Sequence, residues 1–243
     1  LKMSNSLVII PTYNEIENIE SIIRAVFSLH KTFDLLIVDD NSPDHTAKKV
    51  IELQEEFPNQ LFLENGTKKS GLGTAYVRGF RWALSKEYEY IFEMDADFSH
   101  NPNDLEKLYD ACHFGDADLA IGSRYVTGVN VVNWPLSRVL MSYFASVYVK
   151  MITGMKIHDA TAGFVCYKRI VLESINLDKI KFIGYAFQIE MKYRTFAKSF
   201  QIVEVPIIFT DRTKGQSKMS SAIFKEAVLG VISLRIRKFF NRL

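Results

Sequence analysis

Uninterrupted apolar runs alternate, in the first half of the chain, with longer stretches whose apolar residues recur every three or four positions. Residues 7–10 and 35–38 are apolar throughout, which is typical of parallel strands that are buried on both faces. The stretches between such runs have helical spacing, as in residues 16–27. This alternation predicts an α/β fold with βαβ units and a mostly parallel sheet covered by helices on both faces.

The same patterns set the expected boundaries. We expect strands at residues 6–10, 35–38, 61–63, 88–93, 119–122, 163–167 and 202–205. We expect helices at residues 16–27, 46–56, 74–86, 103–112, 137–153, 185–199 and 220–242. Ile16 belongs to the apolar stripe of the first helix, and Ile51 is predicted to face the core from the second.

Composition and charge add limits to this picture. The 243 residues are 48% hydrophobic and 24% charged, which is ordinary for a globular protein. No repeat or linker divides residues 1–243, so we expect a single domain with residues 219–243 as a basic amphipathic C-terminal helix. The net charge is +2, but residues 201–243 carry eight Lys/Arg against three Asp/Glu. Such a basic segment suits nucleic acid, an anionic membrane or a phosphorylated ligand, and charge alone does not choose among them.

The two cysteines and the longest apolar run argue against a CxxC site and against a membrane-spanning helix. Cys112 and Cys166 have no CxxC spacing, so we expect buried free thiols in a reducing compartment. The run at residues 139–149 is flanked by Arg138 and Lys150 and is shorter than the roughly 18–20 apolar residues of a membrane span. No secretory signal is visible, and we expect no transmembrane helix.

Polar residues gather where three of the expected strands end. Residues 11–15, 39–44 and 95–100 follow strands directly, and ligands of open α/β sheets bind outside the carboxyl ends of the strands. Asp95 and Asp97 are two positions apart, so on extended backbone both carboxylates point to one side. Such a pair suits Mg²⁺ or Mn²⁺ together with phosphate oxygens. The alternative is a solvated acidic turn.

Motifs of several other enzyme classes are missing from the sequence. A dinucleotide-binding site would place G-x-G-x-x-G directly after the first strand, where this chain has Pro-Thr-Tyr-Asn-Glu. Gly71 and Gly73 do not make a phosphate-binding Walker loop, and neither a Ser-His-Asp order nor a His-Glu-x-x-His zinc helix is present.

Several short motifs occur in a fixed order along the chain. They are Pro11-Thr12-Tyr13-Asn14-Glu15, Val38-Asp39-Asp40-Asn41-Ser42, Asp95-Ala96-Asp97, Gly122-Ser123-Arg124-Tyr125, Asn133-Trp134-Pro135 and Gly215-Gln216-Ser217-Lys218. With these motifs the sequence resembles the inverting glycosyltransferases of family 2, which have the GT-A fold. It is most similar to polyprenol-phosphate (dolichol-phosphate) mannosyltransferases, from about residue 7 to residue 218.

The resemblance implies a role for each matching residue. The nucleotide sugar would be held by Pro11, Tyr13, Glu15, Val38, Asp40, Asp95, Ala96, Asp97, Arg212 and Lys218. The metal ion, Mg²⁺ or Mn²⁺, would be held by Asp95, Asp97 and Ser99, where many relatives have Gln in place of Ser99. The acceptor phosphate would be held by Arg124, Arg138 and Ser142, and catalysis would depend on Asp97, Arg124, Arg212 and Lys218. Residues 211–219 would form a mobile lid over the nucleotide.

The implied reaction transfers mannose from GDP-mannose to a polyprenyl phosphate with inversion at the anomeric carbon. A phosphomonoester, with its second pKa near ~6, is already a nucleophile at neutral pH, so the acceptor needs positioning rather than a general base. Asp159 stands where relatives with hydroxyl acceptors often have a base. Here it is expected to orient an arginine or to cap the next element.

A lipid acceptor requires contact with a membrane. The C-terminal segment interleaves apolar residues with basic ones, and residues 134–151 are also apolar in large part. Both suit helices that lie in an anionic interface, although packing on the sheet is the alternative. We expect a peripheral protein at the cytoplasmic face of a membrane that binds no nucleic acid, and a small membrane subunit is left open.

Three other functions stay open at this point. The donor would be UDP-glucose in a related lipid-phosphate glucosyltransferase. An enzyme that glycosylates a polysaccharide hydroxyl would depend on Asp159 as its base. The third alternative is a non-catalytic nucleotide-binding scaffold with the same fold.

Overall fold

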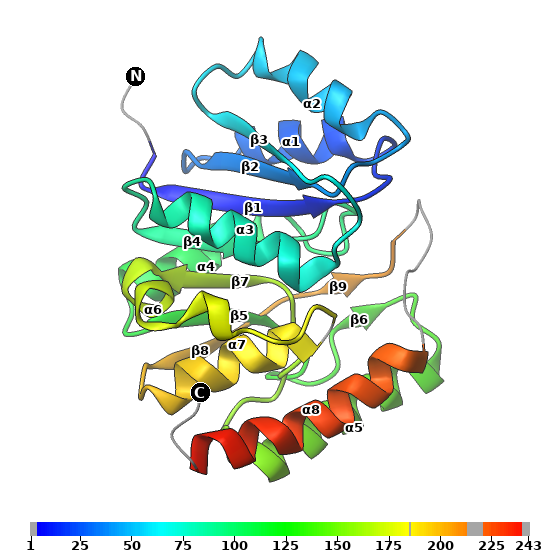
Figure 1. Ribbon diagram of the computed structural model, residues 1–243, viewed down its shortest axis with the longest axis vertical. Coiled ribbons are helices and arrows are strands. Elements are labelled where there is room, and N and C mark those ends of the chain that lie inside the picture. Colours follow the sequence, from blue (N-terminus) through cyan, green and yellow to red (C-terminus); the bar gives the residue numbers. More distant parts are fainter. Residues whose placement is uncertain (1–3, 185, 213–220, 240–243) are drawn as a thin grey trace.

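A seven-stranded sheet forms the centre of the computed structural model, which describes residues 4–184, 186–212 and 221–239, with only the backbone described for residues 221–229 (Figure 1). The strand order is β3-β2-β1-β4-β7-β5-β8. Strand β7 is antiparallel to its two neighbours, β4 and β5, and all other neighbouring pairs are parallel. The strands are β1 (Ser6–Thr12), β2 (Asp34–Asp39), β3 (Leu61–Asn65), β4 (Tyr90–Glu93), β5 (Leu119–Ser123), β7 (Val165–Lys168) and β8 (Ile202–Pro206).

Helices cover both faces of this sheet, because alternate residues of its buried strands point to opposite faces. Val8 and Ile10 pack with helices α1, α2 and α4, whereas Leu7 and Ile9 pack with α3, α6 and α7. The helices are α1 (Ile19–Phe27), α2 (Thr46–Gln54), α3 (Leu72–Leu84), α4 (Asp104–His113), α5 (Leu136–Thr153), α6 (Arg169–Ser174), α7 (Ala186–Ala197) and α8 (Ser221–Phe239), with a 3-10 turn at Leu177–Lys179.

The second half adds a layer that the first half lacks. Helix α8 packs on α7 and α5, and α5 and α8 run side by side beyond the sheet (Figure 1). A separate parallel pair, β6 (Val131–Val132) with β9 (Phe209–Thr210), joins the segment before α5 to the segment after β8. The second half therefore places α5 and α8 in a layer outside the helices that pack directly on the sheet.

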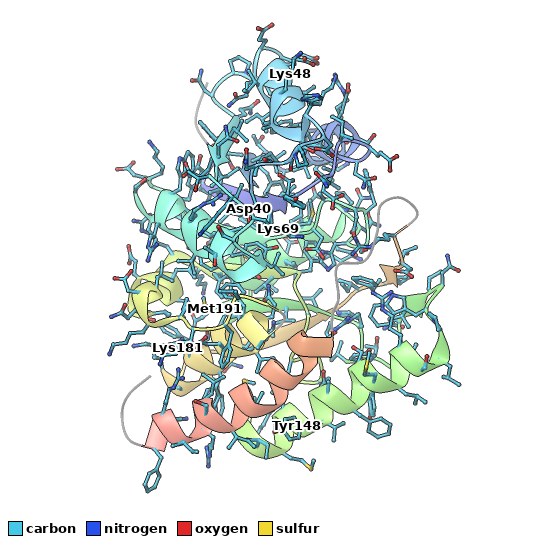
Figure 2. The ribbon with its side chains drawn as sticks, turned by 45° about the vertical axis from the view of Figure 1, so that its right-hand side comes forward. Asp40, Lys48, Lys69, Tyr148, Lys181 and Met191 are labelled. Atoms are coloured by element: carbon cyan, nitrogen blue, oxygen red, sulfur yellow. The ribbon has the colours of Figure 1, made fainter. Side chains whose placement is uncertain are left out.

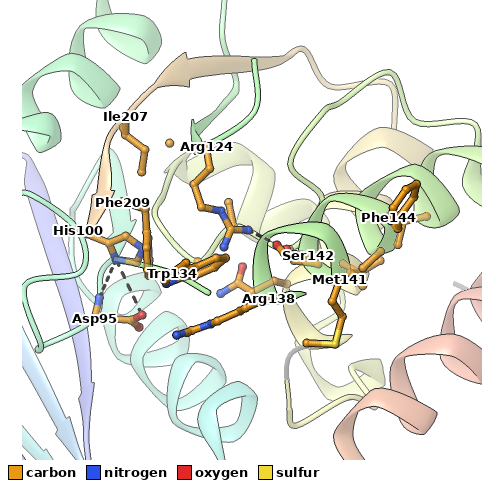
Figure 3. Close-up of a pocket in the computed structure, with 18 of the residues that line it drawn as sticks. Asp95, His100, Arg124, Trp134, Arg138, Met141, Ser142, Phe144, Ile207 and Phe209 are labelled. Carbon is orange, nitrogen blue, oxygen red and sulfur yellow. Dashed lines mark hydrogen bonds and ion pairs between the residues drawn. The ribbon is translucent and has the colours of Figure 1, made fainter. Parts of the chain in front are cut away.

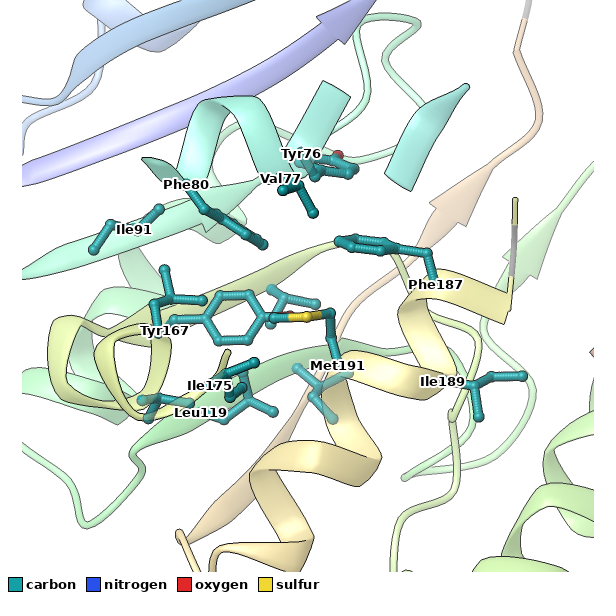
Figure 4. Packing of buried hydrophobic residues seen from close by; sticks show 14 of the residues in the cluster. Tyr76, Val77, Phe80, Ile91, Leu119, Tyr167, Ile175, Phe187, Ile189 and Met191 are labelled. Carbon is teal, nitrogen blue, oxygen red and sulfur yellow. The ribbon is translucent and has the colours of Figure 1, made fainter. Parts of the chain in front are cut away.

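An aromatic cluster fills the core between the sheet and helices α3 and α7 (Figure 4). The rings of Tyr76 and Phe187 are stacked with centroids 5.8 Å apart, and Phe80 meets Tyr167 edge to face at 5.5 Å. Aromatic pairs of this kind add roughly 0.5–1.5 kcal/mol each beyond the area they bury. Because Tyr167 comes from β7 and Phe187 from α7, the cluster joins the two halves of the chain.

Most expected elements are confirmed, with differences that have local causes. Ile16 precedes α1 and is 37% exposed, and Ile51 is 53% exposed on α2, so both predictions of an inward side chain are wrong. In α2 the buried positions are Val50 and Leu53, three residues apart, which leaves Ile51 on the outer face. The sequence analysis missed β6, β9 and α6, which are too short for a periodic signal.

Other expectations have mixed outcomes. Cys112 and Cys166 are both buried free thiols, as expected. Among the described residues, no helix has the length and apolar character that a bilayer crossing requires. Most of the expected lid lies outside the described residues, as does Lys218.

Candidate active site

The carboxyl ends of β1, β2 and β4 lie side by side at one edge of the sheet. We call it the donor edge, because the sequence analysis predicted the nucleotide-sugar donor at these strand ends. The chain moves from β1 to β2 in one direction and from β3 to β4 on the other side of β1, which makes a topological switch point. Tyr13 and Glu15 follow β1, and Asp40 follows β2. The sheet therefore brings these predicted nucleotide-binding residues to one edge.

Asp39 and Asp40 have different tasks at the end of β2. The Asp39 carboxylate accepts hydrogen bonds from the Thr12 hydroxyl at 2.8 Å and from the Ser42 N–H and hydroxyl at 2.7 and 2.6 Å. It joins the loops after β1 and β2 and is buried. Asp40 instead pairs with Arg78 at 3.1 Å and accepts a hydrogen bond from the Ser70 N–H at 2.8 Å. It thereby fixes the loop before α3 at the donor edge.

Lys69 is a donor-edge residue that the sequence analysis did not identify. Its ammonium lies 4.3 Å from the centroid of the Tyr13 ring, within the range of a cation–π contact. Asp40 and Lys69 lie close together in this part of the molecule (Figure 2). Val38, in contrast, is fully buried in the core, so its side chain is not available to a nucleotide.

The acidic loop after β4 has a strained backbone. Phe98 has φ 61°, an uncommon value for a residue other than glycine. The Asp97 carboxylate accepts a hydrogen bond from the Ser99 N–H at 3.0 Å and pairs with Arg212 at 3.1 Å. Ser99 itself is 3% exposed. These contacts tie the loop to Arg212, the second residue of the expected lid.

Asp95 has an electrostatic environment that disfavours its charge. Burial, followed by the negative charge of Asp97, raises the pKa of Asp95 to about 7, although Arg212 acts in the opposite direction. His100 Nδ1 accepts a hydrogen bond from the Asp95 N–H at 3.3 Å, and burial lowers the pKa of His100 to about 4. A neutral imidazole therefore supports the loop that carries the two aspartates.

Arg124 is the most firmly held cation of the site. Its Nε and Nη2 donate to the Asp159 carboxylate at 2.7 and 2.6 Å, and Nη2 also donates to the Thr161 hydroxyl at 2.8 Å. Burial raises the pKa of Asp159, but the charge and hydrogen bonds of Arg124 outweigh it, so the pKa is lowered overall. Asp159 thus orients an arginine, which is one of the two roles expected for it.

Arg138 is held more loosely at the start of α5. It pairs with Asp211 at 3.0 Å, and both side chains are about one quarter exposed. Its guanidinium carbon is 4.1 Å from the centroid of the Trp134 ring. Ser142 follows one helical turn later on α5. Arg124, Arg138 and Ser142 all line one cavity, as their shared predicted role requires (Figure 3).

This cavity of about 520 Å³ connects the acidic loop to the outer helices. Its polar end has Asp95, Arg124, Arg138 and Arg212 in its lining. Its other walls are mainly apolar and come from several elements, among them Leu72, Phe144, Ala145, Tyr148, Val149, Ile189, Ile207 and Val231. The cavity therefore suits a ligand with an anionic end and an apolar body.

A buried polar network supports the floor of the site. The Gln188 amide donates to the Glu93 carboxylate, and the Lys192 ammonium donates to the Ala162 carbonyl oxygen at 2.6 Å. Burial raises the pKa of Glu93 to about 7 and lowers the pKa of Lys192 to about 8. The sequence analysis missed this network because polar residues in a helical pattern are normally assigned to solvent.

The structure separates the predicted site residues into two groups. Asp95, Arg124, Arg138, Ser142 and Arg212 line the cavity, with Asp97 joined to it through Arg212. Ala96 is 5% exposed in the acidic loop. Pro11, Tyr13, Glu15 and Asp40 are not among the residues that line the cavity and lie instead at the donor edge of the sheet. Lys218 is outside the described residues.

Comparison with known proteins gives consistent matches. Residues 7–175 match the family model described as glycosyl transferase family 2. The chain is 46% identical over 237 residues to a polyprenol monophosphomannose synthase of Mycolicibacterium smegmatis, covering 98% of this chain and 89% of that protein. It is 44% identical over 225 residues to an undecaprenyl-phosphate mannosyltransferase of Micrococcus luteus, covering 93% and 91%.

A solved structure has the same arrangement of elements. It is glucosyl-3-phosphoglycerate synthase from Mycobacterium tuberculosis, in complex with Mn²⁺, uridine diphosphate and glucosyl-3-phosphoglycerate. The TM-score is 0.67 at 16% identity, and the match covers 96% of this chain and 78% of that one. At this identity the likeness concerns the fold alone.

Proposed function

Because the chain belongs to glycosyl transferase family 2 and is a glycosyltransferase of GT-A fold, we propose that it transfers mannose from GDP-mannose to a polyprenyl phosphate. The observation that carries this proposal is the cavity, which joins an acidic loop and three arginines to an apolar wall. The names of the two relatives, a polyprenol monophosphomannose synthase and an undecaprenyl-phosphate mannosyltransferase, favour mannose and a lipid phosphate.

The proposed acceptor matches the cavity in both charge and polarity. A polyprenyl phosphate has a dianionic head, for which Arg124 and Arg138 are suitable partners because guanidinium groups bind phosphate oxygens in pairs. Its first isoprene units are apolar and branched, as is the wall near Val149 and Val231. A sugar acceptor would instead require polar groups along this wall.

The acidic loop fits a divalent cation, Mg²⁺ or Mn²⁺. Asp95 and Asp97 are close enough that the charge of one raises the pKa of the other, and a cation between them would relieve this repulsion. Among the described residues, no three acidic, His or Cys side chains form a set that could hold a metal. Mg²⁺ commonly takes one or two carboxylates together with substrate phosphate oxygens, so Asp95 and Asp97 would hold it with Ser99 as a further candidate.

In the proposed reaction, an oxygen lone pair of the acceptor phosphate forms a bond to the anomeric carbon of mannose. The bond from that carbon to the nucleotide diphosphate breaks, and its electron pair stays on the diphosphate oxygen. In-line attack inverts the configuration and gives a β-linked product. A divalent cation, when bound, stabilises the charge of the leaving diphosphate. Arg212, paired here with Asp97, is next to that loop and would add a second positive group.

No general base is required in this reaction, and the environment of Asp159 supports that view. Its side chain is fully buried and both carboxylate oxygens accept hydrogen bonds from Arg124. Arg124 lowers the pKa of Asp159 and weakens it as a base. We propose that Asp159 holds Arg124 against the acceptor phosphate.

We further propose that α5 and α8 contact the membrane surface. The exposed apolar side chains of these two helices include Leu136, Leu140, Phe144 and Met151 on α5 and Ile232, Ile236 and Phe239 on α8. Arg235, Arg237 and Lys238 accompany them on the last turns of α8. Apolar and basic side chains together suit an anionic interface, and the cavity wall at Val149 and Val231 belongs to the same helices.

The test is a transfer assay with purified protein, Mg²⁺ or Mn²⁺, a panel of radiolabelled nucleotide sugars and a polyprenyl phosphate. We expect label in the organic extract only when GDP-mannose is the donor. The same polyprenol without its phosphate is the matched control and should extract no label. If label were extracted only with UDP-glucose, the proposed donor would be wrong. If no donor of the panel gave extractable label, the proposed lipid-phosphate acceptor would be wrong.

A further inference from the structure

Trp134 has contacts that neither the motif nor the family match explains. It lies just before α5, and its ring is between the guanidinium groups of Arg124 and Arg138 (Figure 3). The guanidinium carbons are 5.4 and 4.1 Å from the ring centroid, respectively. One aromatic ring therefore contacts both arginines that are proposed to bind the acceptor phosphate.

Two other rings complete the aromatic surroundings of Arg124. Its guanidinium carbon is 5.3 Å from the Tyr125 ring centroid and 5.5 Å from that of Phe209. Phe209 also meets Trp134 at an angle of 66° with centroids 5.2 Å apart. Cation–π contacts are stronger where water is excluded, and Arg124 is 7% exposed. Three rings thus surround the guanidinium, while Asp159 accepts hydrogen bonds from its edge.

Phe209 links this aromatic group to the acidic loop. Its ring meets the His100 ring at 5.4 Å, and the next residue, Thr210, donates its N–H to the Ser99 carbonyl oxygen at 3.3 Å. Strand β9 also pairs with β6, which ends two residues before Trp134. The position of Trp134 is therefore determined by the same small sheet that touches the metal-binding candidate loop.

The indole N–H of Trp134 is buried and has no hydrogen-bond acceptor among the described residues. Leaving such a donor without a partner is unfavourable and calls for a reason. Trp134 lines the cavity beside Arg138, whose partner Asp211 is only partly buried. A phosphate bound by Arg138 beside the ring would supply the missing acceptor.

We propose that Trp134 is a positioning residue for the acceptor phosphate: its ring holds Arg124 and Arg138 on either side, and its N–H becomes a donor when the phosphate is bound. This inference rests on the proposed function, because it assumes a phosphate acceptor at the two arginines. It predicts an effect on acceptor binding that is separate from donor binding and from stability.

The kinetic test compares two substitutions of Trp134 with a control at the other tryptophan. Trp134→Leu removes ring and N–H and should raise the acceptor KM on the order of 10- to 30-fold, with the donor KM changed less than about 2-fold. Trp134→Phe keeps an aromatic ring without the N–H and should raise the acceptor KM about 3- to 5-fold. Trp82→Phe, on α3 against Phe62 and Tyr88, should leave both constants unchanged.

A spectroscopic test uses the fact that the chain has only two tryptophans. In Trp82→Phe protein, all tryptophan emission comes from Trp134. Titration with farnesyl phosphate should change this emission with saturation, whereas farnesol, which lacks the phosphate, should not. In the same background, Arg138→Gln should weaken the response to farnesyl phosphate.

The outcomes separate this inference from the proposed function. If unsubstituted protein transfers no sugar to a lipid phosphate, the proposed function fails. If it does transfer sugar, two results would refute the role of Trp134. One is an unchanged acceptor KM in folded Trp134→Leu protein, and the other is Trp134 emission that does not change on addition of farnesyl phosphate. The melting temperatures of both variants show whether a loss of activity comes from unfolding. If Trp134→Leu is unfolded, the acceptor KM of Trp134→Phe decides the question.

Discussion

The proposed donor half and the proposed acceptor half of the site are assembled in different ways. Donor-edge residues such as Tyr13 and Asp40 directly follow adjacent parallel strands, so the sheet alone brings them together. The acceptor half depends on side-chain pairs between distant segments. Arg124 pairs with Asp159, and Arg138 pairs with Asp211. The sheet topology therefore positions the donor half, whereas the acceptor half is positioned by ion pairs between side chains of distant segments.

The two halves also differ in how far function and stability are coupled. In the acceptor half, Arg124 and Asp159 are buried and satisfy each other, so loss of either leaves a buried charge. In the acidic loop, the negative charges of Asp97 and Glu93 both act against ionisation of Asp95. Carboxylates held among like charges lower stability rather than raise it. Substitutions should therefore have different consequences in the two halves.

The largest effect is expected at Asp97. Asp97→Asn removes a carboxylate from the metal-binding candidate pair, so kcat should fall by about 10³-fold or more, because charge stabilisation on the leaving diphosphate is worth several kcal/mol. Stability should be nearly unchanged, because loss of the pair with Arg212 is offset by relief of the repulsion between Asp97 and Asp95. Transfer kinetics and urea unfolding measure the two quantities. Asp116→Asn, an exposed aspartate, is the control, and an Asp97 variant that keeps normal kcat would contradict the proposed metal site.

Asp159 should show the opposite combination. Asp159→Asn leaves Arg124 buried without its counter-charge, so the free energy of unfolding should fall by about 3 kcal/mol. The acceptor KM should rise, and residual turnover should remain because no proton has to be removed. Urea unfolding with kinetics at saturating acceptor tests this expectation. Complete loss of turnover with intact nucleotide binding would show that Asp159 is the base after all.

Arg138→Gln is the matched comparison within the acceptor half. Its pair with Asp211 is partly exposed, and such pairs contribute only about 0–1 kcal/mol to stability. The acceptor KM should nevertheless rise strongly, since a phosphate ligand is lost. A stability loss as large as that of Asp159→Asn would show that the two arginines do not differ as the geometry indicates.

Substitutions on the outer surface of the acceptor half should have a smaller effect, and this effect should be on membrane binding. A double substitution, Ile232→Ser with Ile236→Ser, removes two exposed apolar side chains of α8 and should weaken binding to anionic vesicles on the order of 10-fold. Ile51→Ser, at an exposed apolar residue of α2, is the control and should have no effect on vesicle binding. Sedimentation with phosphatidylglycerol vesicles provides the measurement. Unchanged sedimentation of the double variant would remove α8 from the proposed membrane contact.

The same contrast explains what could be predicted from the sequence. Strand ends are local features, so the acidic loop and Asp40 were located correctly from apolar runs and the polar residues that follow them. Ile51 was misjudged because a helical stripe of nine residues can be placed on either of two neighbouring faces. The family resemblance, and not periodicity, pointed to Arg124 and Arg138.

Other residues had no signal in the sequence at all. Phe209 belongs to a two-residue strand whose partner, Val131, is distant in the chain. Lys192 is a charged residue on a helix, where the ordinary expectation is an exposed face, yet it is fully buried and binds a backbone carbonyl oxygen. Contacts of this type depend on tertiary packing and cannot be read from spacing.

The smallest expected effect concerns Asp34, at the start of β2 and thus at the end of the sheet opposite the site. Burial raises the pKa of Asp34 from its ordinary 3.8 to about 6, although the Tyr88 hydroxyl donates to it at 2.9 Å. The folded chain therefore holds this proton more tightly than the unfolded chain, and the stability contributed by the protonated form is lost as pH rises from about 4 through 6. Asp34→Asn should match the unsubstituted protein at pH 4 and raise its melting temperature by roughly 2–4 °C at pH 7.5, with activity unchanged. Thermal unfolding at both pH values gives the test, and a difference that does not depend on pH would mean that packing, rather than the buried carboxylate, limits stability at this end of the sheet.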